Sequence, residues 1–372
     1  MCYNDGMVNE KRLTDTFIAL TAIDAESGDE AAMRAHLTGA LARLGIAAEA
    51  DAAGNLFARL PGTRAGEALL FSAHMDTVRP GKGKRAVVHP DGRITSDGTT
   101  VLGADDAAGL AAILEALTVI REEGLRHPDI ELLFTVEEEA YGVGSAQFDY
   151  SRFRAKTAYV LDLTGPVGTA AAAAPTLLAL DVTVRGRAAH AGFAPENGVN
   201  ALSIAAAALS KLKTGRVEAD TTVNFGTVEG GTGQNIVPAR VRITGEVRSL
   251  RHEAALRQAE TIESVFLREA EALGGTVEVT VTEKIHAYRT ASDAPAARRL
   301  RAALASLGWG EPSLIDTFGG SDNNVFALHG LRGLVLAAAM ELVHTTEEYT
   351  EITELVRSAE LTLKLMTMEG EP

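Results

Sequence analysis

Leu69 to Asp76 reads LLFSAHMD, an apolar run of strand length that ends in a histidine and an aspartate. The run has no helical period, so we predict a buried strand. Positions two apart in a strand point to the same side, so His74 and Asp76 should leave the sheet edge together. A neutral imidazole is a common metal ligand, and it usually donates its other N–H to a carboxylate or carbonyl. This stretch therefore predicts a strand end that carries a metal ligand and its supporting group.

Three other apolar runs end in the same way. They are IELLFTV (130–136), followed by Glu137, Glu138 and Glu139; AYVL (158–161), followed by Asp162; and LVLA (334–337), followed after a short loop by His344. In open parallel α/β sheets, binding sites gather at the carboxyl ends of the strands. Four strand ends that all carry metal-type ligands predict one metal site.

The segment LGADDAAGLAAILEALTVI (102–120) places two more carboxylates, Asp105 and Asp106, at the start of a helix. Its apolar residues recur at helical spacing. An aspartate at a helix N-terminus can cap free N–H groups, so one of the pair can cap while the other faces a metal. Asp162 could similarly begin a turn. For the three consecutive glutamates a solvated charge run is the weaker interpretation, because repulsion at a buried strand end is offset best by a cation.

The collected set contains more ligands than one metal needs. The set comprises His74, His344, Asp105, Asp162 and one or two of the three glutamates. Two histidines and three carboxylates exceed the four groups around a single tetrahedral zinc. They suit two divalent ions roughly 3.5–4 Å apart with a bridging carboxylate. Nitrogen and oxygen ligands without thiolate favour Zn²⁺, with Co²⁺ or Mn²⁺ as alternatives. A spare glutamate beside such a site would serve as general base for the shared water.

Composition narrows the class of protein. A chain of 372 residues should form two domains, and its net charge of −15 argues against a nucleic-acid partner. No apolar run approaches the ~20 residues that a membrane span needs. Cys2 is the single cysteine, and the first twelve residues lack the apolar core of a signal peptide. We therefore expect a cytoplasmic protein.

The order of predicted elements indicates an insertion. In the first part, a helix is expected over 8–22, and Ser27–Glu30 (SGDE) predicts a capping box that opens a helix through about Leu44. From 176 onward, strands (176–186, 222–228, 236–248, 276–281) and helices (201–212, 254–273) follow in the order βαββαβ of a ferredoxin-like unit. We predict a discontinuous catalytic domain, residues 1–175 and 287–372, interrupted by a second domain at 176–286.

Five motifs in this order resemble those of the zinc peptidases that include peptidase T, carboxypeptidase G and the aminoacylases. They are AHMDTV (73–78), LGADDAAG (102–109), FTVEEE (134–139), VLD (160–162) and VHTTEEY (343–349). The likeness covers nearly the whole chain and is closest to peptidase T and the shorter peptidase T-like proteins. It implies an α/β catalytic domain with a mixed, mostly parallel sheet flanked by helices. The inserted ferredoxin-like α+β domain would serve as a lid and would form a homodimer.

Carried over residue by residue, the resemblance assigns roles to the predicted ligands. His74 would bind one metal, and Asp76 would orient the site. Asp105 would bridge the two metals. Asp162 would complete the sphere of the metal bound by His74, and His344 would bind the other metal.

The glutamates follow the family spacing. Glu139 lies five residues before Gly144, so Glu138 would be the general base and Glu139 a ligand of the metal of His344. Two positions depart from the family pattern: Ala107 stands where lysine is common, and Tyr141 stands where glycine is usual. Neither is a ligand, but both weaken any close transfer of substrate preference.

The resemblance also implies substrate contacts. His190, in RGRAAHAGFAPENGVNAL (185–202), would stabilise the tetrahedral oxyanion, although alone we would interpret it as a core histidine. Asn235 in GGTGQNIVP and Arg248 in EVRS would bind substrate, and a guanidinium suits a peptide carboxylate. FGGSDNN (318–324) would place Gly319, Gly320 and Ser321 on the substrate side.

These roles describe a dimetal hydrolase that cleaves an amide bond of a small peptide, and we expect a tripeptide aminopeptidase. A carboxypeptidase or an N-acyl amino-acid deacylase could use the same metal site. A metal-free binding or scaffold protein with a relict site is a third class, and it is disfavoured because no ligand position is degraded.

Overall fold

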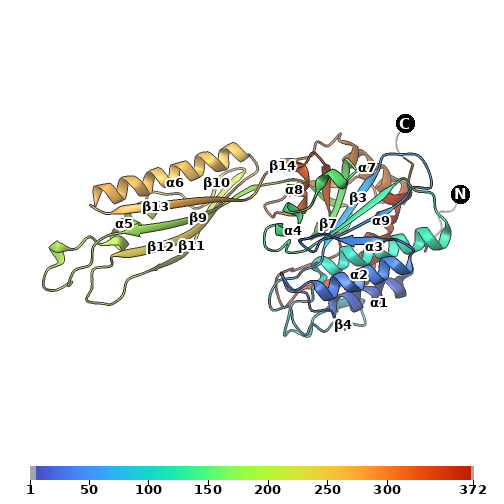
Figure 1. The fold of residues 1–372 in the computed structure, drawn as a ribbon, viewed down its shortest axis with the longest axis horizontal. Helices are drawn as coiled ribbons and strands as arrows, with labels where there is room; N and C mark the ends of the chain where they lie inside the picture. The colour runs from blue at the N-terminus through green and yellow to red at the C-terminus, as the bar shows by residue number, and fades with distance from the viewer. Residues whose placement is uncertain (1–5, 370–372) are drawn as a thin grey trace. The chain divides into compact units, whose positions relative to one another are not determined.

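The computed structural model describes residues 6–369, so Cys2 lies outside the described residues. The chain packs into two compact units of helices and strands (Figure 1). Unit 1 comprises the residues up to Ala173 and those from Arg289 onward, and unit 2 is Ala174–Tyr288. Among the described residues, no helix combines the length and apolar character that a membrane crossing requires.

Unit 1 is built on a nine-stranded sheet with the order β1-β2-β6-β3-β7-β16-β8-β14, in which β15 also pairs with β8. The strands are β1 (Ala48–Ala50), β2 (Leu56–Leu60), β3 (Leu69–His74), β6 (Ile130–Thr135), β7 (Thr157–Leu163), β8 (Thr169–Ala174), β14 (Tyr288–Arg289), β15 (Ser313–Asp316) and β16 (Arg332–Ala337). The central strands β6, β3, β7 and β16 pair in parallel, whereas β1–β2, β2–β6 and β8–β16 pair antiparallel. This confirms the mixed, mostly parallel sheet.

Helices cover this sheet. They are α1 (Glu10–Thr21), α2 (Ala31–Arg43), α3 (Ala104–Glu123), α4 (Val143–Ala146), α7 (Pro295–Leu307), α8 (Asp322–Leu328) and α9 (Ile352–Thr367). Helix α3 packs on β3 and β7 and against α1 and α9, while α8 packs on β7 and β16. A small sheet, β17 (Tyr349–Glu351), β5 (Arg93–Thr95) and β4 (Val87–Val88), joins the loop before α3 to the C-terminal segment.

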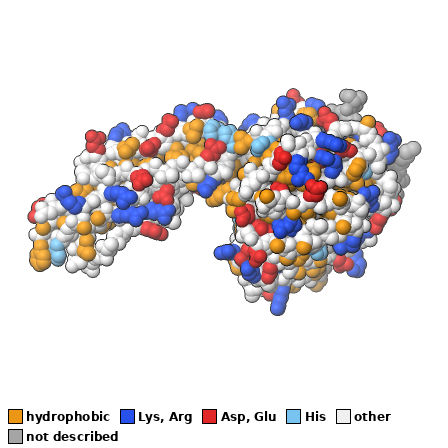
Figure 2. All heavy atoms as spheres, in the orientation of Figure 1, with side chains coloured by type: hydrophobic (Ala, Val, Ile, Leu, Met, Phe, Trp, Pro, Cys, Tyr) orange, Lys and Arg blue, Asp and Glu red, His pale blue; other side chains and the backbone are white. Residues whose placement is uncertain are grey.

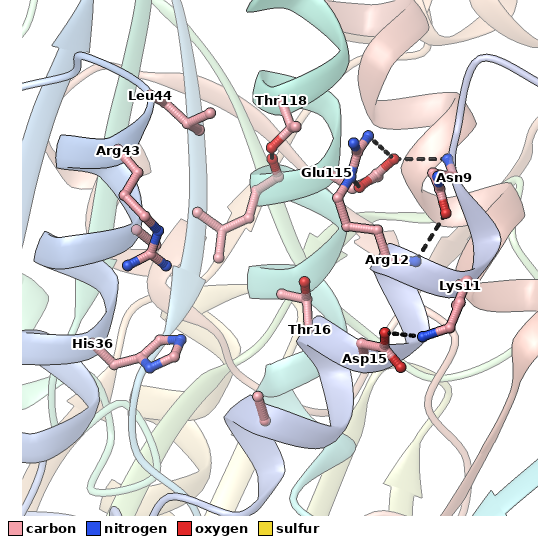
Figure 3. Close-up of a pocket in the computed structure, with 13 residues that line it drawn as sticks. Asn9, Lys11, Arg12, Asp15, Thr16, His36, Arg43, Leu44, Glu115 and Thr118 are labelled. Carbon is pink, nitrogen blue, oxygen red and sulfur yellow. Dashed lines mark hydrogen bonds and ion pairs between the residues drawn. The ribbon is translucent and has the colours of Figure 1, made fainter. Parts of the chain in front are cut away.

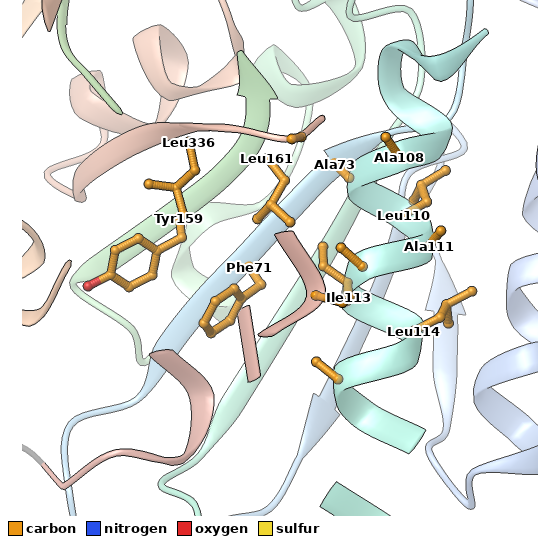
Figure 4. Packing of buried hydrophobic residues seen from close by; sticks show 14 of the residues in the cluster. Phe71, Ala73, Ala108, Leu110, Ala111, Ile113, Leu114, Tyr159, Leu161 and Leu336 are labelled. Atoms are coloured by element: carbon orange, nitrogen blue, oxygen red, sulfur yellow. The ribbon is translucent and has the colours of Figure 1, made fainter. Parts of the chain in front are cut away.

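The core of unit 1 lies where α3 meets the parallel strands (Figure 4). Small residues of α3 such as Ala108 and Ala111 and larger strand residues such as Phe71 are fully buried in this core. Gly109 lets α3 approach β7 closely, since a Cβ there would lie 2.5 Å from the carbonyl oxygen of Leu161 in β7. The alanine-rich helix therefore sits close to the strand ends, and its first residues reach the same sheet edge.

The predicted capping box at Ser27–Glu30 is wrong. Glu30 is the residue before α2 and makes no side-chain cap. Its carboxylate instead accepts hydrogen bonds from the backbone N–H of Gly28 (2.7 Å) and Glu137 (3.2 Å). The Ser27 hydroxyl donates to Asp76 Oδ2 at 2.8 Å. Tertiary partners at the strand ends outcompete the local cap for both side chains.

Unit 2 is a sheet of five antiparallel strands, ordered β10-β11-β12-β9-β13, with α5 and α6 along it (Figure 1). Its elements are β9 (Thr176–Arg185), α5 (Ala201–Leu209), β10 (Gly215–Glu218), β11 (Thr221–Gly230), β12 (Arg240–Ser249), α6 (His252–Ala272) and β13 (Thr276–Ile285). Without the short edge strand β10, this is the predicted βαββαβ ferredoxin-like order. The strand expected from residue 236 begins only at Arg240, and Ile236 forms an isolated bridge with His190 instead.

Candidate metal centre

The predicted ligands follow strands that end at one edge of the sheet. β3 and β6 run in parallel with His74 opposite Thr135, so the segment after β6 begins beside the histidine. Asp162 lies near the end of β7, the neighbour of β3 on its other side. The parallel register thus explains why residues far apart in the sequence meet here.

Asp105 lies between two histidines. Its Oδ1 is 2.8 Å from His74 Nε2, and its Oδ2 is 3.3 Å from His344 Nε2. His74 is buried, whereas half of the His344 side chain is exposed. A carboxylate that turns one oxygen to each of two imidazoles has the geometry of a bridge between two ligand sets.

The remaining carboxylates complete these two sets. Glu139 Oε1 lies 3.0 Å from His344 Nε2, and Asp162 Oδ1 lies 3.9 Å from His74 Nε2. Ligand atoms of His74, Asp105 and Glu139 lie within 4.8 Å of one another, as do those of His74, Glu138 and Asp162. The structure therefore brings all six side chains together, with both Glu138 and Glu139 within ligand distance.

Asp76 holds the ends of two strands together. Its Oδ1 accepts a hydrogen bond from the Glu138 N–H (3.0 Å), and its Oδ2 accepts from the Glu139 N–H (3.2 Å) and the Ser27 hydroxyl. The Nδ1 of His74 lies 2.9 Å from the Asp76 carbonyl oxygen and 3.4 Å from Oδ1. With Nδ1 protonated and donating to these oxygens, the Nε2 of His74 is left for a ligand.

The adjacent residues Asp105 and Asp106 have different partners, in line with the expectation that one caps the helix while the other faces a metal. Asp106 accepts hydrogen bonds from the N–H of Gly109 (3.0 Å) and of His74 (3.1 Å), so it caps α3 and ties it to β3. The backbone N–H of Asp105 donates to the buried carboxylate of Glu348 at 3.0 Å. Sequence reasoning missed Glu348 as a site residue, although it lies in the motif VHTTEEY, four residues after His344.

The backbone around the site is unusual. Among the described residues, the non-glycine residues with positive φ all lie in the loops that carry the glutamates and His344; they are Glu137, Tyr141, Ala339, Leu342 and His344. Each such conformation costs on the order of 1 kcal/mol or more, and such residues cluster at functional sites. At Tyr141 φ is +69°, which explains why a glycine would suit this position.

The charges of the site fit a cation. Burial, with the negative charge of neighbouring carboxylates, raises the pKa of Glu138 and Asp162 well above the usual carboxyl range. Asp105 and Glu139 raise the pKa of His344 to about 10. Glu139 Oε1 is buried and accepts no hydrogen bond in suitable geometry, although His344 Nε2 is near. Crowded carboxylates and an unsatisfied buried oxygen are what divalent ions would neutralise.

A cavity of about 190 Å³ opens onto this site. Its walls include Glu138, Glu139 and His344, together with the predicted substrate-side residues Gly319, Gly320 and Ser321. Ser321 also begins α8, where its side chain and that of Asn324 form a capping box. The loop from FGGSDNN is thereby fixed by the helix that follows it.

The other predicted substrate residues belong to unit 2 and fall into two places. His190 and Asn235 lie on adjacent loops, since the Ala191 N–H donates to the Asn235 carbonyl oxygen at 2.9 Å. Arg248 lies at the far end of β12, opposite Leu177, and its guanidinium donates to Glu246 at 2.8 and 3.1 Å. Leu177 and Arg185 lie eight positions apart on β9, which amounts to roughly 27 Å of strand, and the loop of His190 follows Arg185.

A larger groove of about 590 Å³ lies among α1, α2 and α3 but contains none of the predicted ligands (Figure 3). Arg12 donates there to Glu115 and Glu122, and Lys11 pairs with Asp15. Because these charged side chains pair with one another, we interpret the groove as a result of helix packing and not as a ligand site. On the face drawn in Figure 2, acidic and basic side chains are interspersed, so that face has no continuous basic stripe for a nucleic acid.

Family models match much of the chain. The model of the peptidase dimerisation domain matches residues 174–273, and the model of peptidase family M28 matches residues 55–210. The uncharacterized protein YqjE of Bacillus subtilis (strain 168) is 39% identical over an alignment of 369 residues, and the match covers 97% of this chain and 99% of that protein.

Two solved structures are similar over the same length. Aminopeptidase PepT from Bacillus cereus ATCC 10987 is 40% identical with a TM-score of 0.92, and the match covers 97% of this chain and 99% of that chain. A tripeptidase from Staphylococcus aureus subsp. aureus Mu50 is 35% identical with a TM-score of 0.95 and the same coverage. By this likeness in sequence and fold, the chain belongs to the peptidase T-like family of metallopeptidases.

Proposed function

We propose that this chain is a dinuclear metal-dependent aminopeptidase that removes the N-terminal residue of tripeptides. The observation that carries the proposal is the position of Asp105, whose two carboxylate oxygens face His74 and His344 separately. The full-length similarity to an aminopeptidase and to a tripeptidase supports the substrate class.

Two sets of residues would hold the metals. His74, Asp162 and one oxygen of Asp105 would bind the first ion, and His344, Glu139 and the other oxygen would bind the second. When bound, the ions would lower the pKa of a shared water and polarise the scissile carbonyl. We propose Zn²⁺, which suits nitrogen and oxygen ligands, with Co²⁺ or Mn²⁺ as replacements.

Glu138 is the proposed general base. It lines the cavity, while Asp76 holds its backbone N–H. Burial raises its pKa well above the usual carboxyl range, and nearby cations would lower that pKa again. A carboxylate whose pKa lies close to the working pH can accept a proton from water as the water attacks the carbonyl, and can then donate the proton to the leaving amine.

His190 is the proposed donor to the oxyanion. Its Nδ1 accepts hydrogen bonds from the backbone N–H groups of Gly192 and Phe193, both at 3.1 Å. An Nδ1 that accepts carries no proton, so the neutral ring must carry its proton on Nε2. The ring stacks on Phe193 with centroids 4.2 Å apart, which fixes its plane. His190 is thereby held as a neutral N–H donor, which suits a developing negative charge.

The inserted unit is the proposed site of homodimerisation, because the dimerisation-domain model matches residues 174–273. The sequence expectation of a cytoplasmic location also stands as a proposal.

The test is product analysis with three forms of one tripeptide: free, N-acetylated and C-terminally amidated. An aminopeptidase should release the N-terminal residue from the free form and leave the acetylated form intact, and it should cleave the amidated form more slowly where a guanidinium such as that of Arg248 binds the substrate carboxylate. Release of the C-terminal residue would identify a carboxypeptidase, and release of acetate would identify a deacylase; either outcome would overturn the proposed specificity.

A further inference from the structure

Unit 2 holds a second group of metal-type side chains, His252, Glu283 and His286. One ligand atom from each lies within 4.8 Å of the other two. None of them belongs to the candidate metal centre at the strand ends (the strand-end site), whose ligands are all in unit 1. Sequence pattern does not join them, because His252 begins α6, Glu283 lies near the end of β13 and His286 follows that strand.

A break in strand register brings Glu283 and His286 to the same side. β13 pairs Glu283 with Leu178 and Ile285 with Leu177, so Lys284 is an extra residue on this strand. Residues three apart in a regular strand point to opposite faces, and one inserted residue restores the same face. Accordingly, the Nδ1 of His286 lies 2.8 Å from Glu283 Oε1.

His252 approaches from the first turn of α6. Its ring centroid is 4.2 Å from that of His286, with 31° between the ring planes. Its Nδ1 lies 3.1 Å from the hydroxyl oxygen of buried Thr176, which also accepts the Ala287 N–H at 2.9 Å. With the Nδ1 proton donated to that oxygen, Nε2 is the nitrogen left for a metal, as in other histidine ligands.

We propose that His252, Glu283 and His286 form an accessory binding site for one transition-metal ion, with Zn²⁺ or Cu²⁺ as the ions of choice. Two imidazoles and a carboxylate suit these ions better than Mg²⁺ or Ca²⁺. Three protein ligands leave one tetrahedral position for water. The side chains of His286 and Glu283 are 31% and 41% exposed, so the ion exchanges with the solution. It would tie the start of α6 to the end of β13 and to His286, which lies two residues before the end of unit 2 at Tyr288.

The test counts ions on the full-length protein. Protein loaded with its resident metals is dialysed to equilibrium against increasing Zn²⁺, and bound zinc per chain is measured by elemental analysis. Wild-type protein should bind one more ion than His252→Ala or His286→Ala. Glu283→Gln, which keeps the side-chain volume, should weaken the binding of this ion at least about tenfold. His89→Ala, which removes a histidine of unit 1, should match wild type.

The comparison is independent of how many ions the strand-end site holds, because only the difference between variants is read. Co²⁺ supplies a second readout, since its visible absorption reports nitrogen and oxygen ligands and should lose one component in the unit 2 variants. Equal ion counts in wild type and all three unit 2 variants would overturn the proposal and leave two tilted histidine rings, with His286 Nδ1 beside Glu283 Oε1.

Discussion

The Oδ1 of Asp76 accepts the backbone N–H of Glu138 at 3.0 Å, so an aspartate at the end of β3 positions the proposed base after β6. The same carboxylate also accepts the N–H of Glu139. An amide in place of this carboxylate has one acceptor oxygen instead of two, and its NH₂ group would face a backbone N–H. Asp76→Asn should therefore lower kcat by about 10- to 100-fold while the protein stays folded. Steady-state kinetics with metal analysis checks this, and unchanged kcat would contradict the positioning role.

Glu138→Gln should abolish most turnover and leave the metal content unchanged. The amide cannot accept the proton of the attacking water, and loss of a general base costs roughly 10²- to 10⁴-fold in kcat. Glu137→Gln is the matched control, because the neighbouring residue belongs to neither ligand group. If Glu137→Gln loses activity and Glu138→Gln keeps it, the base is assigned to the wrong glutamate.

His344→Ala should lose one ion of the strand-end site and retain the other. His344 contacts Glu139 and one oxygen of Asp105, whereas His74 retains Asp162 and the other oxygen. Elemental analysis after gel filtration counts the ions, with His89→Ala as the control. Retention of both ions would show that His344 is not a ligand.

Glu348 should act through the backbone that carries Asp105. Its two oxygens accept the N–H groups of Gly103 (2.7 Å) and Asp105 (3.0 Å) in a buried setting. Glu348→Ala leaves both donors unpaired, so the free energy of unfolding should fall by about 1–3 kcal/mol. Metal affinity should fall by roughly 10- to 100-fold. Glu348→Gln keeps one acceptor and should fall between Glu348→Ala and wild type in both measurements; an affinity equal to wild type in Glu348→Ala would make the residue purely structural.

Gly109→Ala should destabilise unit 1. The new Cβ would lie 2.4 Å from Asp106 Oδ1 and 2.5 Å from the Leu161 carbonyl oxygen, so α3 must move away from β7 at a cost of about 1–3 kcal/mol. Gly39→Ala is the matched control inside α2, where the nearest atom is 3.7 Å away. Alanine at position 39 should raise the free energy of unfolding by about 0.5–1 kcal/mol. Denaturant unfolding measures this free energy, which should fall in Gly109→Ala and rise in Gly39→Ala. Equal changes in the two variants would contradict the close packing of α3 on β7.

Much of the fold and of the ligand cluster follows from local sequence pattern. The buried runs that end at His74 and Asp162 are parallel neighbours, and parallel neighbours deliver their last residues to one edge. The ferredoxin-like order of unit 2 can also be predicted from the sequence, because the apolar residues of its strands and helices recur at the spacing of each element type. Family resemblance, rather than pattern, assigns separate roles to Glu138 and Glu139.

What could not be predicted depends on partners distant in sequence. SGDE has the pattern of a capping box, yet Glu30 accepts the N–H of Glu137 and Ser27 donates to Asp76. Glu348 has the sequence of a solvated charge run and is buried because two backbone N–H groups need an acceptor. The extra residue at Lys284 has no sequence signature, so the His252 cluster becomes visible only in the fold.

The most direct test of the central proposal is recovery of tripeptide cleavage as Zn²⁺ is added back to chelator-treated protein. Because the strand-end site is proposed to need both ions, N-terminal cleavage should be absent without metal and should reach its maximum only after two ions per chain have bound at that site. His252→Ala is the protein for this titration, since it lacks the proposed accessory site. Full activity without metal, or a maximum at one ion, would contradict a dinuclear aminopeptidase.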